Sequence, residues 1–177
     1  MGTMRWIWIV IALSVALPTA ASAQSAYVGV GAGPAVRMDD WPTQGRVEQE
    51  IGVFFNRRPT GFYLGFAPSQ SWGNDWWILT FPLRLGGLAQ IYESRDLTFA
   101  LGGTGTVGFA LSDQFDTRDD PDPWFHFSFA FILRLMFGSN FAIYLRPVGF
   151  EFAFGDTGRF GNEAIRYVAA GGIQYFF

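Results

Sequence analysis

The chain has 177 residues, enough for one domain, and it contains no cysteine, which excludes disulfides, thiol chemistry and cysteine-based zinc sites. Its formal net charge of −3 and pI near 5.0 leave no basic surface for nucleic acid, so no nucleic-acid partner is expected.

The N-terminal residues 1–23 have the pattern of a cleavable secretory signal peptide. Arg5 supplies a positive charge, residues 6–17 form an apolar core, and residues 21–23 form a small-residue cleavage site. The core is too short for a membrane-spanning helix, which needs roughly 20 apolar residues. We therefore expect residues 24–177 to form a single domain outside the cytoplasm.

After the signal peptide, eight segments alternate between large apolar residues and small or polar ones. In the clearest segment, 124–138, phenylalanine and leucine occupy nearly every second position, and His126, Ser128 and Arg134 lie opposite. A period of two residues predicts β-strands and not helices. The predicted strands are 26–37, 47–56, 60–68, 76–92, 97–112, 124–138, 140–154 and 164–177.

The connections between these segments alternate in length. Short turns are predicted at 56–59, 94–96 and 138–139, and longer polar loops at 39–46, 69–75, 113–123 and 155–163. Short turns at one end and longer loops at the other are typical of an up-and-down membrane barrel. The tryptophans beside the longer loops fit an interfacial girdle, and they are Trp41, Trp72, Trp76, Trp77 and Trp124.

The last segment ends on Phe177, with Ile173 and Tyr175 on the same face. It resembles the closing strand of bacterial outer-membrane β-barrels, and the whole pattern resembles the OmpA transmembrane domain and its small OmpX-like relatives. The resemblance implies an all-β, eight-stranded antiparallel up-and-down transmembrane β-barrel in a Gram-negative outer membrane, with both termini periplasmic. It also implies a monomer that contacts lipid and lipopolysaccharide. Ile173, Tyr175 and Phe177 would then signal to the barrel-insertion machinery after periplasmic chaperones deliver the chain.

A secreted lipocalin-like barrel is the soluble alternative. Its polar face would be solvated and rich in lysine and glutamate. Here the polar face is mostly glycine, alanine and threonine with scattered ionisable residues. This composition favours a narrow lumen, which in an eight-stranded barrel is filled by side chains.

If the phenylalanine-rich faces contact lipid, the ionisable residues opposite them point into the lumen. Near Pro147 the alternation changes phase, as at a β-bulge, which brings Arg146 and Glu151 both inward. Unpaired charge in a narrow lumen is costly, so we expect a hydrogen-bonded network. Its predicted members are Arg37, Glu48, Glu50, Arg84, His126, Arg134, Tyr144, Arg146, Glu151 and Arg166.

Two functions are open for such a network. It could plug the barrel of a protein that has a structural and surface-interaction role in the envelope. It could instead act as a gate that opens a narrow pore for water or small ions. The plug is the favoured prediction.

His126 and Ser128 also resemble the His-x-Ser pair of the outer-membrane lipid A deacylase family, in which a glutamate completes an acyl-hydrolase triad. The resemblance implies His126 as general base, Ser128 as nucleophile and Glu151 as the candidate carboxylate. It covers three residues, and Phe129 stands where that family has asparagine. The pair also lies on the expected lumenal face, so membership of the lumenal network is the favoured alternative, and the protein is not expected to be an enzyme.

Five aspartates in residues 113–123 offer carboxylate oxygens of the kind that bind Ca²⁺ or Mg²⁺. They are Asp113, Asp116, Asp119, Asp120 and Asp122. Their spacing matches no EF-hand pattern, so a solvated loop is favoured, and neither a metal nor a cofactor is expected.

Overall fold

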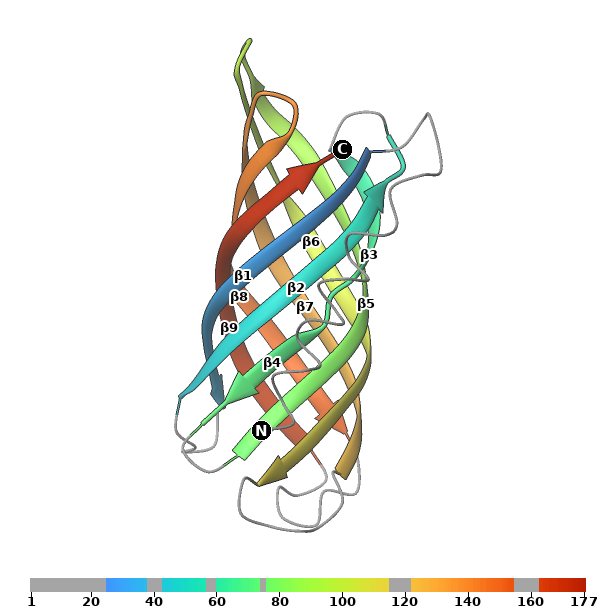
Figure 1. The fold of residues 1–177 in the computed structure, drawn as a ribbon, viewed down its shortest axis with the longest axis vertical. Coiled ribbons are helices and arrows are strands. Elements are labelled where there is room, and N and C mark those ends of the chain that lie inside the picture. Colours follow the sequence, from blue (N-terminus) through green and yellow to red (C-terminus); the bar gives the residue numbers. More distant parts are fainter. Residues whose placement is uncertain (1–24, 38–42, 57–59, 74–75, 115–121, 155–162) are drawn as a thin grey trace.

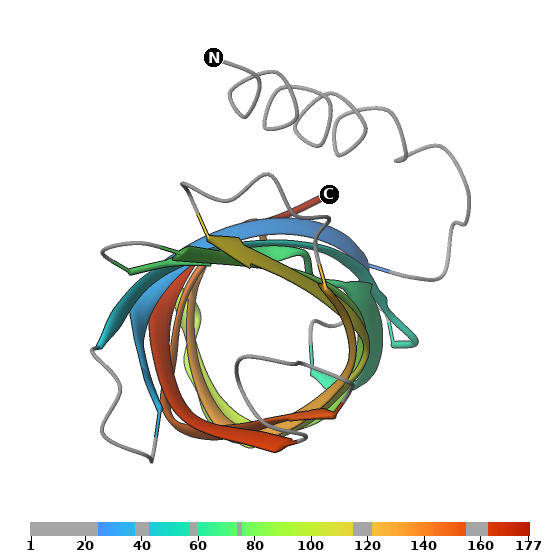
Figure 2. The same ribbon diagram turned by 90° about the horizontal axis from the view of Figure 1, so that it is seen from below.

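The computed structural model describes residues 25–37, 43–56, 60–73, 76–114, 122–154 and 163–177. The predicted signal peptide lies outside this part of the chain. The described residues form nine β-strands that curve into a closed barrel (Figure 1, Figure 2). The strands are β1 (Ser25–Arg37), β2 (Gln44–Phe54), β3 (Gly61–Phe66), β4 (Ser69–Trp72), β5 (Trp76–Glu93), β6 (Leu97–Gln114), β7 (Asp122–Phe137), β8 (Phe141–Phe154) and β9 (Glu163–Phe176).

The sheet closes because β1 pairs antiparallel with both β2 and β9. β3 and β4 share one place in the ring, since each pairs with β2 on one side and β5 on the other. The remaining strands follow one another in chain order. The ring therefore has eight strand positions, and the predicted eight-stranded antiparallel up-and-down barrel is confirmed.

Two of the predicted loop boundaries are wrong. Ser69–Trp72 was expected in a loop but forms β4, and residues 44–46 were expected in a loop but begin β2. Neither stretch has the alternation of large apolar residues that marks the other strands. Pro68 separates β3 from β4 because it has no N–H to donate, yet its carbonyl accepts a hydrogen bond from the Gln49 amide at 2.9 Å.

Alternation along the strands separates an inner and an outer face. In β2 every second residue from Gln44 to Phe54 is buried inside the barrel. The outer face is apolar and exposed, with Phe62 74% and Phe109 66% exposed. The barrel therefore carries its charged residues on the inner face and large apolar residues on the outer face, which is the reverse of the distribution in a soluble protein. The described residues include no helix that is both long and apolar enough to cross a membrane.

The predicted bulge in β8 is confirmed. Between Arg146 and Gly149 the pairing with β9 shifts register, because β8 carries one more residue than its partner. The same irregularity appears opposite β7. As a result Arg146 and Glu151 are both buried in the lumen, although five positions separate them.

The expected tryptophan girdle is wrong at Trp124. This side chain is 3% exposed and packs inside the barrel against Ile78, Ala110 and Ala153. It precedes the outward Phe125, so the period of β7 turns it inward. Trp72 is 41% exposed, and the side chains of Trp41 and Trp76 lie outside the described part of the chain.

Candidate functional site

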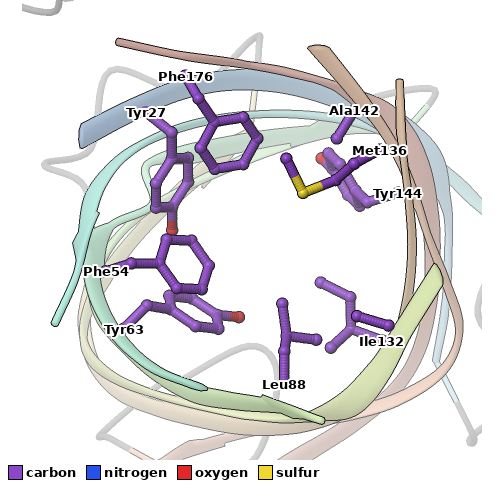
Figure 3. Close-up of a cluster of buried hydrophobic side chains, with 10 residues drawn as sticks. Tyr27, Phe54, Tyr63, Leu88, Ile132, Met136, Ala142, Tyr144 and Phe176 are labelled. Atoms are coloured by element: carbon purple, nitrogen blue, oxygen red, sulfur yellow. The ribbon is translucent and has the colours of Figure 1, made fainter. Parts of the chain in front are cut away.

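The lumen is divided into layers along the barrel axis. An apolar layer lies beside the short turns and the C-terminus (Figure 3). It consists of Tyr27, Phe54, Tyr63, Leu88, Ala100, Ile132, Met136, Ala142, Tyr144 and Phe176. A smaller apolar group beside the longer connections consists of Ile78, Ala110, Trp124 and Ala153. Most charged side chains belong to the positions between these layers, so the candidate site is the middle of the lumen.

Four rings of the first layer pack together and form an aromatic cluster. Phe54 lies 5.0 Å from Tyr63 and 5.4 Å from Tyr27 between ring centroids, and Tyr27 lies 5.5 Å from Phe176. The Arg134 guanidinium lies within 6 Å of all four ring centroids, closest to Phe54 at 4.8 Å. A desolvated cation over aromatic faces is stabilised by about 2 kcal/mol or more. The cluster thus closes one wall of the lumen around a fully buried arginine.

The first ion cluster is organised by Glu48 and Glu50 on β2. Because they are two residues apart, both point inward. Arg84 on β5 reaches both carboxylates, with N–O distances of 2.7 Å to Glu50 and 3.4 Å to Glu48. The Tyr144 hydroxyl donates to Glu48 at 2.7 Å, and Arg146 forms an ion pair with the same carboxylate.

Glu50 has two further donors, which tie the cluster to β1 and β9. The Tyr27 hydroxyl donates to it at 2.6 Å, and the Gln174 amide at 3.5 Å. Gly65 lies between β2 and β5 in the sheet and has no side chain to separate Glu50 from Arg84. A Cβ there would lie 3.3 Å from a Glu50 oxygen and 3.2 Å from the Tyr27 hydroxyl.

The second ion cluster surrounds Glu151 on β8. Arg46 from β2 forms an ion pair with one of its carboxylate oxygens. Arg166 from β9 donates to the other at 2.6 Å and to the Gln44 amide oxygen at 3.2 Å. His126 from β7 places Nε2 3.5 Å from Glu151. Removing one member of such a buried set leaves its partner uncompensated, which typically costs 3–5 kcal/mol.

The described lumen contains more positive than negative side chains. Its buried carboxylates are Glu48, Glu50 and Glu151, whereas its buried guanidinium groups are Arg46, Arg84, Arg134, Arg146 and Arg166. The side chains fill most of the space, and a cavity of about 10 Å³ remains among them in mid-lumen. A cavity of this size holds about one water molecule.

Most of the residues predicted for the network lie on the inner face. Glu48, Glu50, Arg84, Tyr144 and Arg146 meet in the first ion cluster, and His126, Glu151 and Arg166 in the second. Arg134 is buried in the aromatic cluster. Arg37 ends β1 opposite Arg166, and its side chain is outside the described part of the structure.

Sequence reasoning missed Arg46, Tyr27, Gln44 and Gln174. Arg46 and Gln44 were assigned to a loop because only Val47 and later residues show clear alternation. Tyr27 and Gln174 lie in predicted strands, and Gln174 shares the polar face of Arg166, but the predicted network does not include either of them. The period of two was the available signal in each case.

His126 and Ser128 do not form the arrangement of a hydrolase triad. The Ser128 hydroxyl shares a 2.6 Å hydrogen bond with that of Thr106. Within the described residues, neither His126 nitrogen has a hydrogen-bond partner. His126 is 1% exposed and enclosed in the lumen, where its nearest carboxylate is Glu151.

The remaining candidate residues within the described part of the chain lie near the ends of strands. Ile173, Tyr175 and Phe177 are exposed on the outer face, and the Phe177 amide donates to the Ala26 carbonyl at 3.0 Å. Asp113 and Asp122 belong to the ends of β6 and β7. Asp116, Asp119 and Asp120 lie outside the described residues, so the aspartate-rich loop stays a prediction.

No family model and no curated protein matches the sequence. Solved structures do match the fold. The N-terminal β-barrel domain of Pseudomonas aeruginosa OprF aligns with a TM-score of 0.54 at 10% identity, over 85% of this chain and 97% of that domain. Neisserial surface protein A aligns with a TM-score of 0.55 at 10% identity, over 90% of this chain and all of the other. The chain therefore has the fold of the small outer-membrane β-barrels that its sequence resembles.

Proposed function

We propose that this protein is an integral outer-membrane β-barrel of a Gram-negative bacterium with a closed lumen, acting as a structural and surface-interaction protein of the cell envelope. The observation that carries the proposal is the inverted distribution of side chains. Large apolar residues such as Phe62 and Phe109 are exposed all round the barrel, while eight Arg and Glu side chains are buried within it. Water is a poor solvent for such an outer surface, and lipid hydrocarbon is a good one.

The two ion clusters, which both cross the lumen, support the proposal that it is closed. Glu48 on β2 binds Tyr144 and Arg146 on β8, so the first ion cluster crosses the lumen. Arg46 and Glu151 cross it again in the second. A hydrated ion would have to break these pairs to pass, and each break exposes an uncompensated charge. A structural role fits this arrangement better than conduction.

The proposed orientation places the short turns and both termini in the periplasm and the longer connections outside. External partners would then bind those connections, and the barrel wall would contact lipid and lipopolysaccharide. The exposed Ile173, Tyr175 and Phe177 would be read by the insertion machinery after periplasmic chaperones deliver the chain. We propose that the protein is monomeric.

The test is to refold residues 24–177 into lipid vesicles and then to measure single-channel conductance in planar bilayers. We expect a heat-dependent gel shift, which reports a folded barrel, and an electrically silent membrane. Failure to form a heat-modifiable barrel in lipid would contradict the membrane location. Discrete openings would contradict the closed lumen but not the membrane location.

A narrow pore for water or small ions is the second candidate, and the water-sized cavity among the ion clusters favours it. Conductance that rises when Glu151 is replaced by alanine would support a gate built on the second ion cluster. The same measurement on Glu93→Gln, an exposed residue at the end of β5, controls for changes outside the lumen.

A further inference from the structure

Two glutamines lie on the outer wall of the barrel, where the other described side chains between the strand ends are apolar, aromatic or glycine. Gln49 in β2 stands between two buried glutamates, so the strand period turns it outward. Gln70 in β4 stands between two buried serines and is turned outward in the same way. An amide that faces lipid hydrocarbon without a hydrogen-bond partner is costly, and polar side chains at such positions typically mark a functional site.

The two amides are neighbours at the break between β3 and β4. The Gln49 amide N–H donates to the Pro68 carbonyl at 2.9 Å, and Gln70 pairs with Val47 on β2. Residues in this diagonal relation on neighbouring strands are about 7–8 Å apart, which is within reach of one ligand. Oε1 of Gln49 has no hydrogen-bond partner among the described residues. It therefore needs a donor from outside the barrel.

Trp72 indicates how deep this pair of amides lies in the membrane. It is exposed on the same wall opposite Gly45, where a Cβ would lie 3.2 Å from the indole Nε1. Tryptophan is enriched at the membrane–water interface. Gln70 is separated from Trp72 by about 7 Å along β4 and Gln49 from Gly45 by about 13 Å along β2, at about 3.3 Å per residue. In the proposed orientation both amides lie in the outer leaflet, below the lipid head groups.

An apolar groove continues from the amides towards the C-terminus. Its volume is about 340 Å³, which is within the usual range of small-molecule sites. Its walls include Ile51, the next outward residue after Gln49, together with Val28, Phe66 and Phe177. No outward side chain of β1 or β2 is aromatic within the described residues, so this part of the wall is smooth. The wall thus carries two hydrogen-bonding groups at one end of a hydrocarbon-lined groove.

We propose that this site binds one lipopolysaccharide molecule, an inference that rests on the proposed membrane location and orientation. Amide and hydroxyl groups of the acyl chains would bind Gln49 and Gln70, and one saturated chain would lie in the groove. A glutamine amide both donates and accepts hydrogen bonds. Glycerophospholipids carry only ester carbonyl acceptors at this depth, so they cannot donate to Oε1 of Gln49. The acyl chains of lipopolysaccharide carry amide N–H and hydroxyl donors beside their carbonyl acceptors.

Native mass spectrometry of the refolded barrel, residues 24–177, tests this selectivity. The barrel is released from micelles that contain equimolar lipid A, the acylated part of lipopolysaccharide, and phosphatidylglycerol. Both lipids are anionic, so a difference between them does not report the sign of the head-group charge. We expect a one-to-one complex with lipid A, about tenfold more abundant than the complex with phosphatidylglycerol, as for one net hydrogen bond. Equal occupancy by the two lipids would overturn the proposal.

Matched glutamine variants locate the site. Gln49→Leu removes the donor and the acceptor, and the occupancy by lipid A should fall about tenfold while that by phosphatidylglycerol stays unchanged. Gln90→Leu changes an exposed glutamine near the end of β5, and it should keep the wild-type selectivity. Equal occupancy by lipid A in the two variants would contradict the assignment to this wall.

The heat-dependent gel shift in phosphatidylcholine vesicles separates this inference from the envelope role. Gln49→Leu should form the barrel there at least as well as the wild type, because leucine is better suited to hydrocarbon than an amide. A wild-type barrel that forms in these vesicles and does not select lipid A would overturn the lipopolysaccharide site alone. Failure of the wild type to form a barrel in lipid would contradict both proposals.

Discussion

At the scale of single residues, burial makes each lumenal charge dependent on its partners. Glu151 is 2% exposed and is bound by both Arg46 and Arg166. Its carboxylate therefore offsets two guanidinium groups that have lost their hydration. A charged group with this many partners is sensitive to substitution even when the shape of the side chain is preserved.

We predict that Glu151→Gln lowers the free energy of unfolding by about 3–5 kcal/mol, because two buried arginines lose their counter-charge. Urea unfolding in lipid vesicles measures this change. The exposed Glu93→Gln is the control and should stay within about 0.5 kcal/mol of the wild type. Similar losses in the two variants would show that burial of the charge is not the cause.

Glycines on the inner face leave room in the lumen for the side chains of the ion clusters. A Cβ at Gly31 would overlap the Tyr144 hydroxyl, which donates to Glu48, and would lie 3.2 Å from the Gly171 carbonyl oxygen. A Cβ at Gly103 on the outer face would meet its nearest atom, the Ala130 carbonyl oxygen, at 3.9 Å. The two glycines therefore differ in the space around them and not in strand geometry.

We predict that Gly31→Ala destabilises the barrel by about 1–3 kcal/mol through overpacking, since Tyr144 has to move from Glu48. Gly103→Ala should be neutral or slightly stabilising. Urea unfolding of both variants is the measurement, and a Gly31→Ala variant as stable as the wild type would contradict the tight packing around Tyr144.

At the scale of elements, the extra residue in β8 allows Arg146 and Glu151 to share the lumen. Without it, the residues after Pro147 would exchange faces, because a one-residue shift inverts every side chain that follows. Glu151 would then face lipid and Phe150 the lumen. The bulge is thus a requirement of both ion clusters and not a local irregularity.

We predict that deleting Val148, an outward residue of the bulge, abolishes formation of the heat-modifiable barrel. Val148→Ala keeps the residue count and should fold with a cost below about 1.5 kcal/mol. The heat-dependent gel shift after refolding in vesicles distinguishes the deletion variant from Val148→Ala. A folded deletion variant would show that the register of β8 is adjustable.

The sequence predicted elements where large residues alternate with small ones, as in β7, where Phe125 to Phe137 define the outer face. It failed at Ser69–Trp72, where the first three residues are small or polar, so no alternation is visible before Trp72, and where Pro68 interrupts the ladder. The period of two residues also predicted that the ionisable side chains point into the lumen. It could not predict which of them form ion pairs, because Arg46 and Glu151 are 105 residues apart and meet only through the register of the closed ring.

At the scale of the whole molecule, the outer surface differs between a lipid-embedded barrel and a soluble one. Phe129 lies near the middle of β7 and is 52% exposed, whereas Phe137 ends the same strand and is 42% exposed. In a membrane these positions differ in depth. In water they would be equivalent surface residues.

We predict that Phe129→Arg destabilises the barrel in vesicles by about 2–4 kcal/mol, because arginine on the lipid face is most costly near the bilayer midplane. Phe137→Arg should cost about 0–1 kcal/mol near the interface. Unfolding free energies of both variants test this. Equal costs would contradict the proposed depth of β7 in the bilayer.

The contacts across the lumen also constrain how the barrel assembles. β2 carries Arg46 and Glu48, and β8 carries Glu151 and Arg146, yet these strands become neighbours across the lumen only when β1 pairs with β9. An open sheet would keep the pairs between nearby strands, such as Glu151 with Arg166, but would hold Arg46 away from Glu151 and Arg146 away from Glu48. Closing the seam therefore completes both ion clusters at once, and we expect the last step of barrel assembly to be cooperative.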